Sequence, residues 1–296
     1  MAKVAFVFPG QGSQKVGMGK AVFEETDAGR EAFETVDAAL GTSLSGLCFE
    51  GPEADLKLTS NTQPAILTTS IALYRALGET PDVAAGTFGL ADAAEVCRQR
   101  GLFMQEAVPV GEGGMAAVMK AEPELVKRIC AETEGVVEPA NYNSPGQIVI
   151  AGAKEAVDAA AAALEEAGAR AVPLAVSAPF HSSLMKPAQD RLAPVLGELA
   201  VADPAFPVYT NVDAAPVSAG ASAVDALVRQ VSGAVRWDES VRAMIDAGVG
   251  LFVEIGQGNV LTNLLRRIDK GVARCSVQSP ADFEAAREAI VAARAG

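Results

Sequence analysis

The chain has 296 residues, half of them apolar, and 37 acidic against 24 basic side chains give a net charge of -13. This length and apolar content predict one large folded domain, or a large one with a small insert, and exclude a disordered chain. The acidic balance argues against a nucleic-acid backbone as partner, and the single histidine, His181, excludes metal sites built on histidine pairs or triads.

The first predicted elements are two strands, a loop and two helices. Residues 4–8 are an apolar run broken by Pro9-Gly10, which is typical of a buried parallel strand. The loop Gly10-Gln11-Gly12-Ser13-Gln14 follows, with neither dinucleotide nor P-loop spacing. Residues 61–77 have the apolar stripe of a helix, with Asn61 or Thr62 as the cap and Pro64 in the first turn. Residues 83–86 then predict a short strand and residues 90–107 a second helix.

The middle of the chain has a different pattern. Its predicted elements are a strand at 115–119, a helix at 123–130, strands at 136–141 and 147–151, a helix at 154–167 and a strand at 169–174. This β-α-β-β-α-β order is the ferredoxin-like arrangement. We therefore predict a small subdomain over residues 115–176, inserted into a core domain that is formed by residues 1–114 and 177–296.

The last part of the chain returns to alternating strands and helices. Strands are predicted at 207–211, 251–255 and 272–277, and helices at 184–199, 240–247, 260–268 and 283–293. Alternation on both sides of the insert predicts an α/β fold, a large hydrolase-like domain with a mostly parallel sheet. Ligands of such sheets bind at the carboxyl ends of the strands.

The cysteines and the N-terminus indicate the compartment. The cysteines lie far apart with no C-x-x-C pair, at Cys48, Cys97, Cys130 and Cys275. The N-terminal apolar stretch is too short for a signal peptide, and no apolar run approaches the ~20 residues of a membrane helix. We expect a cytoplasmic monomer without cofactor, metal, membrane or nucleic-acid partner.

Arg100 is the first candidate functional residue. On the predicted helix 90–107 it shares a face with Phe103, Met104 and Ala107. A buried guanidinium without an anion costs several kcal/mol, so the side chain requires a carboxylate. That group is either a carboxylate of the protein or one of the substrate, held by two guanidinium N–H groups.

His181 is the second candidate. It lies in the turn-forming stretch Ser177-Ala178-Pro179-Phe180-His181-Ser182-Ser183, after a predicted strand and before a helix. A single histidine is either a packed side chain or a base, and its position in a loop favours catalysis.

No nucleophile can be recognised from the residues alone. An acyl-transfer enzyme on such a sheet is expected to carry serine in a G-x-S-x-G turn, and no serine of this chain lies between glycines at that spacing. Cys97 is a poor substitute, because it lies mid-helix without a visible activating partner.

Over nearly its whole length the chain resembles the bacterial malonyl-CoA:acyl-carrier-protein transacylases of fatty-acid synthesis. The matching stretches are Phe8-Pro9-Gly10-Gln11-Gly12-Ser13-Gln14, Asn61-Thr62-Gln63-Pro64-Ala65, Arg100-Gly101 with Met104-Gln105-Glu106-Ala107, Asn141-Tyr142-Asn143-Ser144-Pro145-Gly146-Gln147, Pro179-Phe180-His181-Ser182-Ser183-Leu184-Met185, and Glu254-Ile255-Gly256 with Gly258 and Val260-Leu261-Thr262. Their joint order is what makes the resemblance specific.

The resemblance implies the site residues and the substrates, malonyl-CoA and acyl carrier protein. Gln11 would help form the oxyanion hole through its backbone N–H, and Arg100 would bind the malonyl carboxylate. His181 would carry the proton between the nucleophile and the leaving thiol, its ring oriented by a backbone carbonyl near residues 256–259. Phe180, beside the histidine, would disfavour a methyl branch on the acyl group. The remaining substrate-binding residues implied are Gln63 and Asn143.

One departure from the family concerns the nucleophile. In the family the strand matching residues 83–86 leads into Gly-His-Ser-Leu-Gly-Glu and a short helix, and that serine is the nucleophile. Here Gly86 is followed directly by Thr87-Phe88-Gly89-Leu90, which resembles the family's sequence after that helix. About a dozen residues, with the serine and a second histidine, are absent. If Gly86 and Thr87 are bonded, their Cα atoms lie ~3.8 Å apart.

Three functional hypotheses follow. The first is an acyltransferase of this family, which in the absence of the serine shows no transfer. The second is a catalytically silent protein that binds acyl carrier protein or CoA through basic residues, namely Lys186, Arg191, Arg266, Arg267 and Lys270, which otherwise form a solvated helix surface. The third, a serine hydrolase on a related sheet, is weaker because Arg100 suits a substrate carboxylate better than a neutral acyl chain.

Overall fold

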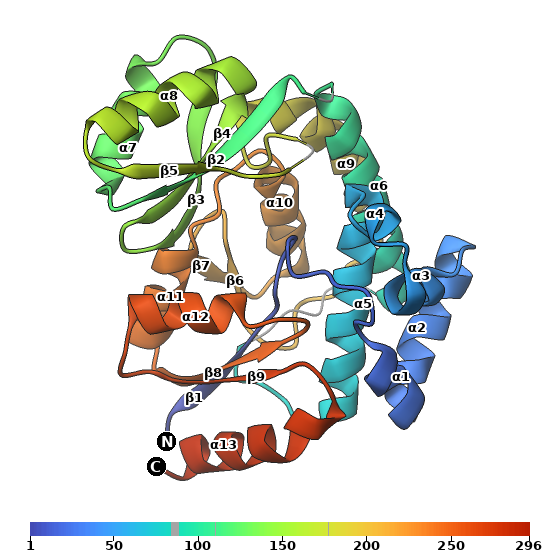
Figure 1. The fold of residues 1–296 in the computed structure, drawn as a ribbon. Helices are drawn as coiled ribbons and strands as arrows, with labels where there is room; N and C mark the ends of the chain where they lie inside the picture. The colour runs from blue at the N-terminus through green and yellow to red at the C-terminus, as the bar shows by residue number, and fades with distance from the viewer. Residues whose placement is uncertain (84–88, 110, 177) are drawn as a thin grey trace.

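The computed structural model describes residues 1–83, 89–109, 111–176 and 178–296. Within them the strands form a parallel sheet A, an antiparallel sheet B and a two-stranded sheet (Figure 1). The strands are β1 (Lys3–Val7), β2 (Gly113–Met119), β3 (Val137–Ser144), β4 (Gln147–Ala153), β5 (Arg170–Pro173), β6 (Val208–Thr210), β7 (Ala215–Val217), β8 (Val249–Ile255) and β9 (Ala273–Val277). The helices are α1 (Lys20–Glu25), α2 (Asp27–Leu40), α3 (Leu44–Glu50), α4 (Glu53–Leu56), α5 (Thr59–Leu77), α6 (Leu90–Ala107), α7 (Pro123–Glu132), α8 (Lys154–Glu166), α9 (Lys186–Gly197), α10 (Gly220–Gln230), α11 (Trp237–Asp246), α12 (Val260–Ile268) and α13 (Phe283–Ala295).

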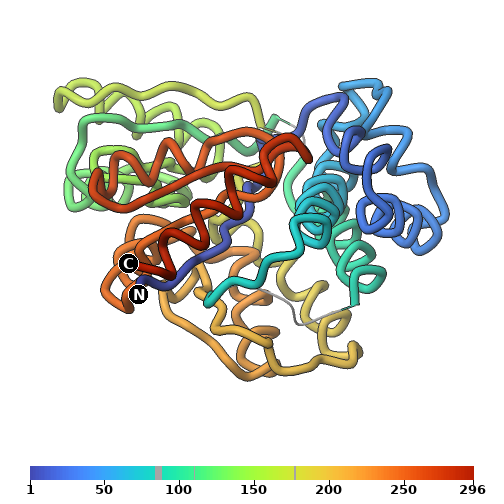
Figure 2. Tube along the Cα trace, turned by 90° about the horizontal axis from the view of Figure 1, so that it is seen from below, coloured from blue at the N-terminus to red at the C-terminus, as the bar shows by residue number. Residues whose placement is uncertain are grey.

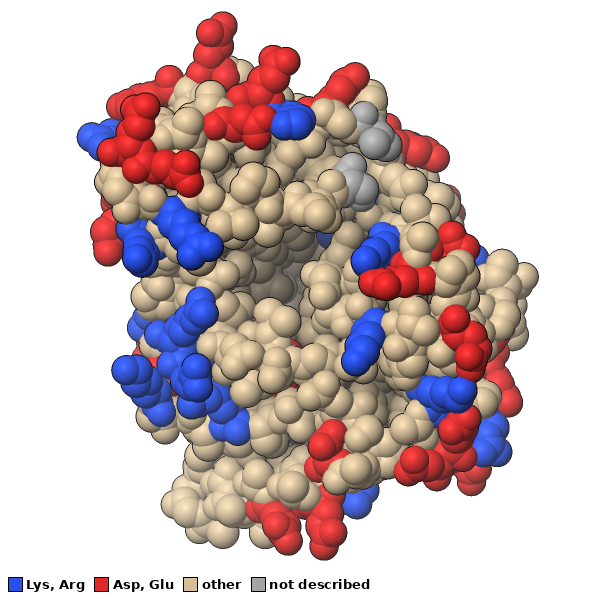
Figure 3. All heavy atoms as spheres, in the orientation of Figure 1, with Lys and Arg blue, Asp and Glu red and all other residues tan. Residues whose placement is uncertain are grey.

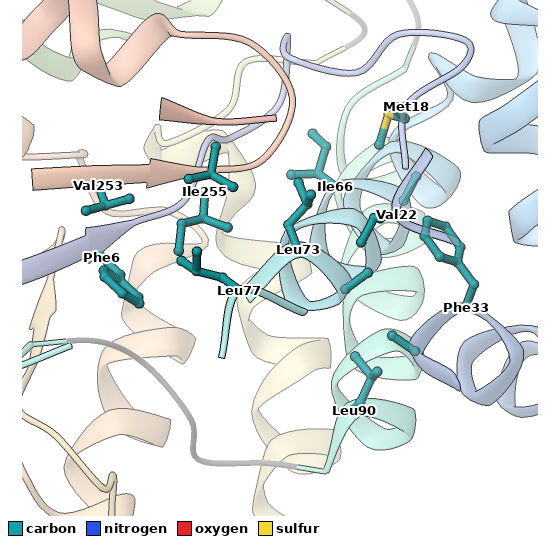
Figure 4. Packing of buried hydrophobic residues seen from close by; sticks show 14 of the residues in the cluster. Phe6, Met18, Val22, Phe33, Ile66, Leu73, Leu77, Leu90, Val253 and Ile255 are labelled. Carbon is teal, nitrogen blue, oxygen red and sulfur yellow. The ribbon is translucent and has the colours of Figure 1, made fainter. Parts of the chain in front are cut away.

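Sheet A is the centre of the core domain. Its order is β1-β8-β9, and both pairings are parallel, as the alternating pattern predicts. Its strands are buried because α5 covers one face, and Figure 4 shows Ile255 of β8 beside Leu73 and Leu77 of α5. Trp237 and Val241 of α11 belong to the cluster on the opposite face. The chain ends meet beside β1, where the N–H of Ala2 donates to the carbonyl of Ala293 (Figure 2).

The sheet continues beyond β1 towards the predicted strand at 83–86. Val83 forms a parallel bridge with Ala5, and its carbonyl accepts a hydrogen bond from the N–H of Phe6 at 3.1 Å. The rest of that predicted strand and the junction between Gly86 and Thr87 lie outside the described residues.

Sheet B and its two helices have the predicted β-α-β-β-α-β order, β2-α7-β3-β4-α8-β5, and the strand order β3-β4-β2-β5. Alternate residues of its strands enter two different clusters, since side chains of a strand point to opposite faces. Ala116 and Val118 pack under α7 and α8, whereas Met115 packs with Met185 and Leu192 against α9. Sheet B is thus buried on both faces. The predicted division at 1–114, 115–176 and 177–296 stays a prediction.

Two predicted elements differ from the observed ones. Helix α5 begins at Thr59 with Leu58 as its cap, so Pro64 lies inside the helix. Thr62 does not cap, because its hydroxyl donates to the carbonyl of Leu56 at 2.6 Å. The predicted strand at 207–211 is only three residues long, and it pairs antiparallel with β7. In the described parts of the chain, no helix is long and apolar enough to cross a membrane.

Candidate active site

Helices α5 and α6 pack along each other and bring Gln63 next to Arg100. Nη1 of Arg100 donates a hydrogen bond of 2.6 Å to Oε1 of Gln63. The amide nitrogen of Gln63 in turn lies 3.8 Å from the sulfur of Met104, on the same α6 face as Arg100. Two residues that the resemblance implies as substrate-binding are therefore in direct contact.

Gly101 permits this close packing. A Cβ at this position would lie 2.6 Å from the Cα of Ser60 and 2.6 Å from the carbonyl oxygen of Thr59. No side chain fits there, so the backbones of α5 and α6 approach closely just after Arg100.

The side chain of Arg100 contacts a neutral amide, although its positive charge would favour a carboxylate. Within the described ranges no ion pair is formed by this side chain, in contrast to Arg191, which pairs with Glu106 at 2.6 Å. Burial lowers the pKa of Arg100, because desolvation disfavours the charged guanidinium, and the nearby Cys97 has the opposite, smaller effect. The guanidinium is thus half-buried and charged at neutral pH, and among the described contacts it is hydrogen-bonded at one N–H group, which leaves donors for an anion.

His181 is held by two backbone carbonyls of one segment. Its Nδ1 lies 3.1 Å from the carbonyl oxygen of Gln230 and 3.2 Å from that of Gly233. Carbonyls only accept, so Nδ1 carries the ring proton and Nε2 keeps a lone pair. The expectation that a carbonyl near residues 256–259 orients the ring is wrong, because the carbonyls at Nδ1 come from Gln230 and Gly233, and Gly256 packs against Pro9. Gln230 and Gly233 were missed because a backbone acceptor has no signature in the sequence.

The conformation and charge state of His181 are unusual. Its φ is 60°, in the left-handed region that residues other than glycine seldom adopt, and such strain is found at functional sites. Burial and the neighbouring positive charge of Arg100 lower the pKa of His181 to about 4, although the bonds to Gln230 and Gly233 act in the opposite direction. The imidazole is therefore neutral at pH 7 and able to accept a proton at Nε2.

Gln11 lies in an exposed loop that reaches the beginning of α5. Its side-chain amide donates to the hydroxyl of Thr59 at 3.3 Å, four residues before Gln63. Gly12 follows with a φ of 103°, which a residue with a Cβ rarely adopts, and its N–H donates to the side chain of Gln14. The loop is thus folded over the end of the helix that carries Gln63. The oxyanion role of the Gln11 N–H stays a prediction.

The contacts of Phe180 connect it with the residues around Arg100 and Gln63, whereas the described contacts of Asn143 do not. Phe180 is buried in the cluster that contains Met104, the residue beside Gln63. Asn143 lies half-buried on β3, and the described contacts do not connect it with Arg100 or His181. Both substrate-binding roles stay predictions.

Two other features, a surface cavity and Cys97 near Arg100, are not among the predicted site residues. A surface cavity of about 570 Å³ is lined by Arg98, Thr42 and Ser60 on the face of α6 that points away from Arg100. Burial raises the pKa of the Cys97 thiol to about 11, so this cysteine stays protonated and cannot replace the absent serine.

Comparison with known proteins decides the family. The model of the acyl transferase domain matches residues 5–279. The chain belongs to this acyl transferase family. A relative in Bacillus subtilis, named malonyl CoA-acyl carrier protein transacylase, is 42% identical, with 97% of this chain and 96% of the relative covered.

Solved structures of the family have the same fold. Acyl-carrier-protein S-malonyltransferase from Bartonella henselae matches with a TM-score of 0.95 and 42% identity, covering 98% of this chain and 99% of that chain. A malonyl-transacylase in complex with a type II PKS acyl-carrier protein matches with a TM-score of 0.94 and 39% identity, covering 97% of this chain and all of the other. The predicted α/β fold and the resemblance to the malonyl transacylases are confirmed, and so is acyl transfer as the family's reaction.

The alignments also bear on the absent nucleophile. The match to the Bacillus subtilis relative extends over 306 positions, more than the 296 residues of this chain, so the relative has positions without a counterpart here. This number is compatible with the absence of about a dozen residues that the resemblance predicts after Gly86, which stays a prediction.

Proposed function

We propose that this protein binds malonyl-CoA and acyl carrier protein in the manner of a malonyl transacylase, and that its 296 residues supply every part of the site except the nucleophile. In the complete reaction a serine hydroxyl attacks the malonyl thioester while His181 takes its proton and returns it to the leaving CoA thiol. The thiol of the carrier's phosphopantetheine then attacks the malonyl-serine, and the same imidazole takes and returns that proton. Without the serine, the chain binds its substrates and no malonyl-enzyme forms.

The half-buried guanidinium of Arg100 carries this proposal. Partial removal of a cation from water is costly without a charged partner, and Gln63 offers only a neutral amide oxygen at 2.6 Å. A carboxylate of about the size of a malonyl end group would supply the missing charge and bind two N–H groups at once. The oriented imidazole of His181 lies near enough to Arg100 for the charge of the guanidinium to lower its pKa, which supports a shared substrate.

Calorimetric titration with malonyl-CoA and acetyl-CoA tests this proposal, since the two differ in the free carboxylate. A charge-assisted hydrogen-bond pair predicts that malonyl-CoA binds about 10-fold to 100-fold more tightly. Arg100→Ala abolishes that difference, and Arg100→Lys restores only part of it, because an ammonium cannot form the two-pronged contact. The matched control is Arg98→Ala, on the opposite face of α6. Equal affinities for the two thioesters would refute the proposal.

Binding of acyl carrier protein requires a docking surface, and the basic residues predicted for it differ in their ion pairs. Of the basic residues predicted for docking, Lys186 pairs with Asp190 at 2.7 Å and Arg191 pairs with Glu106 at 2.6 Å. Their charges are therefore largely neutralised.

The basic residues at the end of α12 differ from that pair. Arg266 and Arg267 of α12 and Lys270 just after it are exposed, and in the described residues none of them pairs with a carboxylate. Figure 3 shows basic side chains gathered where Figure 1 labels α11 and α12, beside a hollow below sheet B. We propose this α12 surface as the one that meets an acidic carrier protein. The cytoplasmic location and the monomeric state stay predictions.

A further inference from the structure

The segment that holds His181 is itself held by one side chain. Gln230 is the last residue of α10, and its amide nitrogen folds back to donate to the carbonyl of Gly233 at 2.8 Å and to that of Ala234 at 3.4 Å. The carbonyl of Gly233 therefore accepts two hydrogen bonds, one from this amide and one from Nδ1 of His181. A carbonyl oxygen has two lone pairs, so both bonds can be made together.

We propose that the side-chain amide of Gln230 is a positioning group for the base, which keeps the carbonyls of residues 230 and 233 turned towards His181 and so fixes its proton on Nδ1. The residue acts twice, because its own carbonyl also accepts from the ring at 3.1 Å. The inference rests on the proposed function only in treating His181 as the base. A ring with its proton on Nδ1 presents the lone pair of Nε2 to the reacting group, and the other tautomer cannot accept a proton there.

The other described contacts of this segment, residues 230–235, hold its ends. The N–H of Gly233 donates to the carbonyl of Arg229 at 2.8 Å. Val235 is bound into sheet B, donating to Ala140 and accepting from Tyr142, both at 2.8 Å. The hydroxyl of Ser232 bonds to Gln189 on α9. Among the described residues, only the amide of Gln230 acts directly on the Gly233 carbonyl that faces the imidazole, so its loss should alter the ring rather than unfold the segment.

The single histidine makes the test direct, because every imidazole signal comes from His181. Protein labelled with ¹⁵N-histidine is examined by long-range ¹H–¹⁵N NMR, which distinguishes the two ring nitrogens and follows the charge of the ring with pH. In the unaltered chain we expect almost pure Nδ1–H tautomer. Gln230→Met keeps the length of the side chain without its donor, and we expect the ratio of Nδ1–H to Nε2–H to fall by about threefold to tenfold. We expect the same fall of this ratio in Gln230→Ala, which also lacks the donor and has a smaller side chain.

Two features distinguish positioning from a general loss of structure. Loosening that admits water would raise the pKa of His181 towards its ordinary value, whereas weaker carbonyl acceptors alone lower it, because those bonds favour the charged ring. The charged neighbour of the ring, Arg100 on α6, is unchanged in both variants. Ser232→Ala is the matched control, since it removes a bond of the same segment that does not touch the carbonyls.

An unchanged tautomer ratio in the Gln230 variants, or an equal change in Ser232→Ala, would overturn the proposal. The measurement needs neither malonyl-CoA nor turnover. Failure of the malonyl-binding proposal would therefore leave this result intact, and failure of this inference would leave the titrations with malonyl-CoA unaffected.

Discussion

At the scale of single residues, the candidate site places the positive charge of Arg100 near a neutral imidazole. Arg100 and His181 are both half-buried, and the charge of the first is one of the two causes that lower the pKa of the second. A malonyl carboxylate bound to Arg100 would cancel that charge and make the imidazole more basic. Substrate binding would thus raise the proton affinity of the base when it is needed.

The lowered pKa of His181 predicts an acid-sensitive stability. The folded protein holds the ring neutral down to about pH 4, whereas the unfolded chain binds a proton below about 6.5. Between these values the unfolded state binds more protons, so the free energy of unfolding should fall as the pH is lowered, by up to about 3 kcal/mol. His181→Gln cannot take up the proton. Urea unfolding of both proteins at pH 7 and pH 4.5 should show a smaller loss in the variant, and parallel losses would contradict the assigned pKa.

At the scale of elements, the α5–α6 pair holds Arg100 beside Gln63, where we propose the carboxylate site, and the end of α12 with Lys270 beyond it carries the proposed docking surface. The first depends on the absence of a side chain at Gly101, and the second on charges that pair with no carboxylate of the described residues. Each dependence can be tested with a substitution and a nearby control.

Gly101→Ala should separate α5 from α6. The added Cβ would lie 2.6 Å from backbone atoms of Ser60 and Thr59, so the helices must move apart, at a cost of about 1–3 kcal/mol in the free energy of unfolding. The bond between Arg100 and Gln63 would be disturbed as well. In the control Gly197→Ala, on α9, the new Cβ meets nothing within 4 Å. Urea unfolding should show a lower free energy of unfolding for Gly101→Ala alone. Equal stability of the two variants would contradict this account of the packing.

Removal of the α12 charges should weaken carrier-protein binding. We expect the double variant Arg266→Ala, Lys270→Ala to bind acyl carrier protein about fivefold more weakly, with a reduced dependence on salt. Lys186→Ala, which removes a charge already paired with Asp190, should have little effect. Calorimetric titration at two salt concentrations checks this. A larger effect of Lys186→Ala than of the double variant would contradict this prediction and indicate that the carrier protein docks on α9.

At the scale of the whole molecule, much of the architecture could be predicted from local patterns. The parallel core and the β-α-β-β-α-β subdomain follow from periodicity, and the order of the motifs identified the family. Helix α5 began earlier than expected because Leu58 and Thr59 carry no capping pattern, and Pro64 is tolerated inside it. The acceptors of His181 could not be predicted, because Gln230 and Gly233 contribute backbone atoms whose positions depend on the tertiary fold.

The absent segment should also affect stability. The helix after the family's nucleophile would bury several side chains, each contributing about 1.5–3 kcal/mol. We expect that inserting the corresponding segment of the Bacillus subtilis relative between Gly86 and Thr87 raises the free energy of unfolding by about 3–6 kcal/mol. An insert with alanine in place of its serine should stabilise equally. Urea unfolding compares the three proteins, and an insert without stabilising effect would mean that the shortened chain has repacked fully.

The most direct measurement of the central claim is the intact mass of the protein after incubation with malonyl-CoA. The 296-residue chain should keep its own mass, because His181 and Arg100 are present without a nucleophile. The chain with the inserted segment should gain one malonyl group and lose it on addition of acyl carrier protein, and the alanine insert should gain none. A malonyl adduct on the unaltered 296-residue chain would contradict the account, since it would show that another residue of this protein acts as the nucleophile.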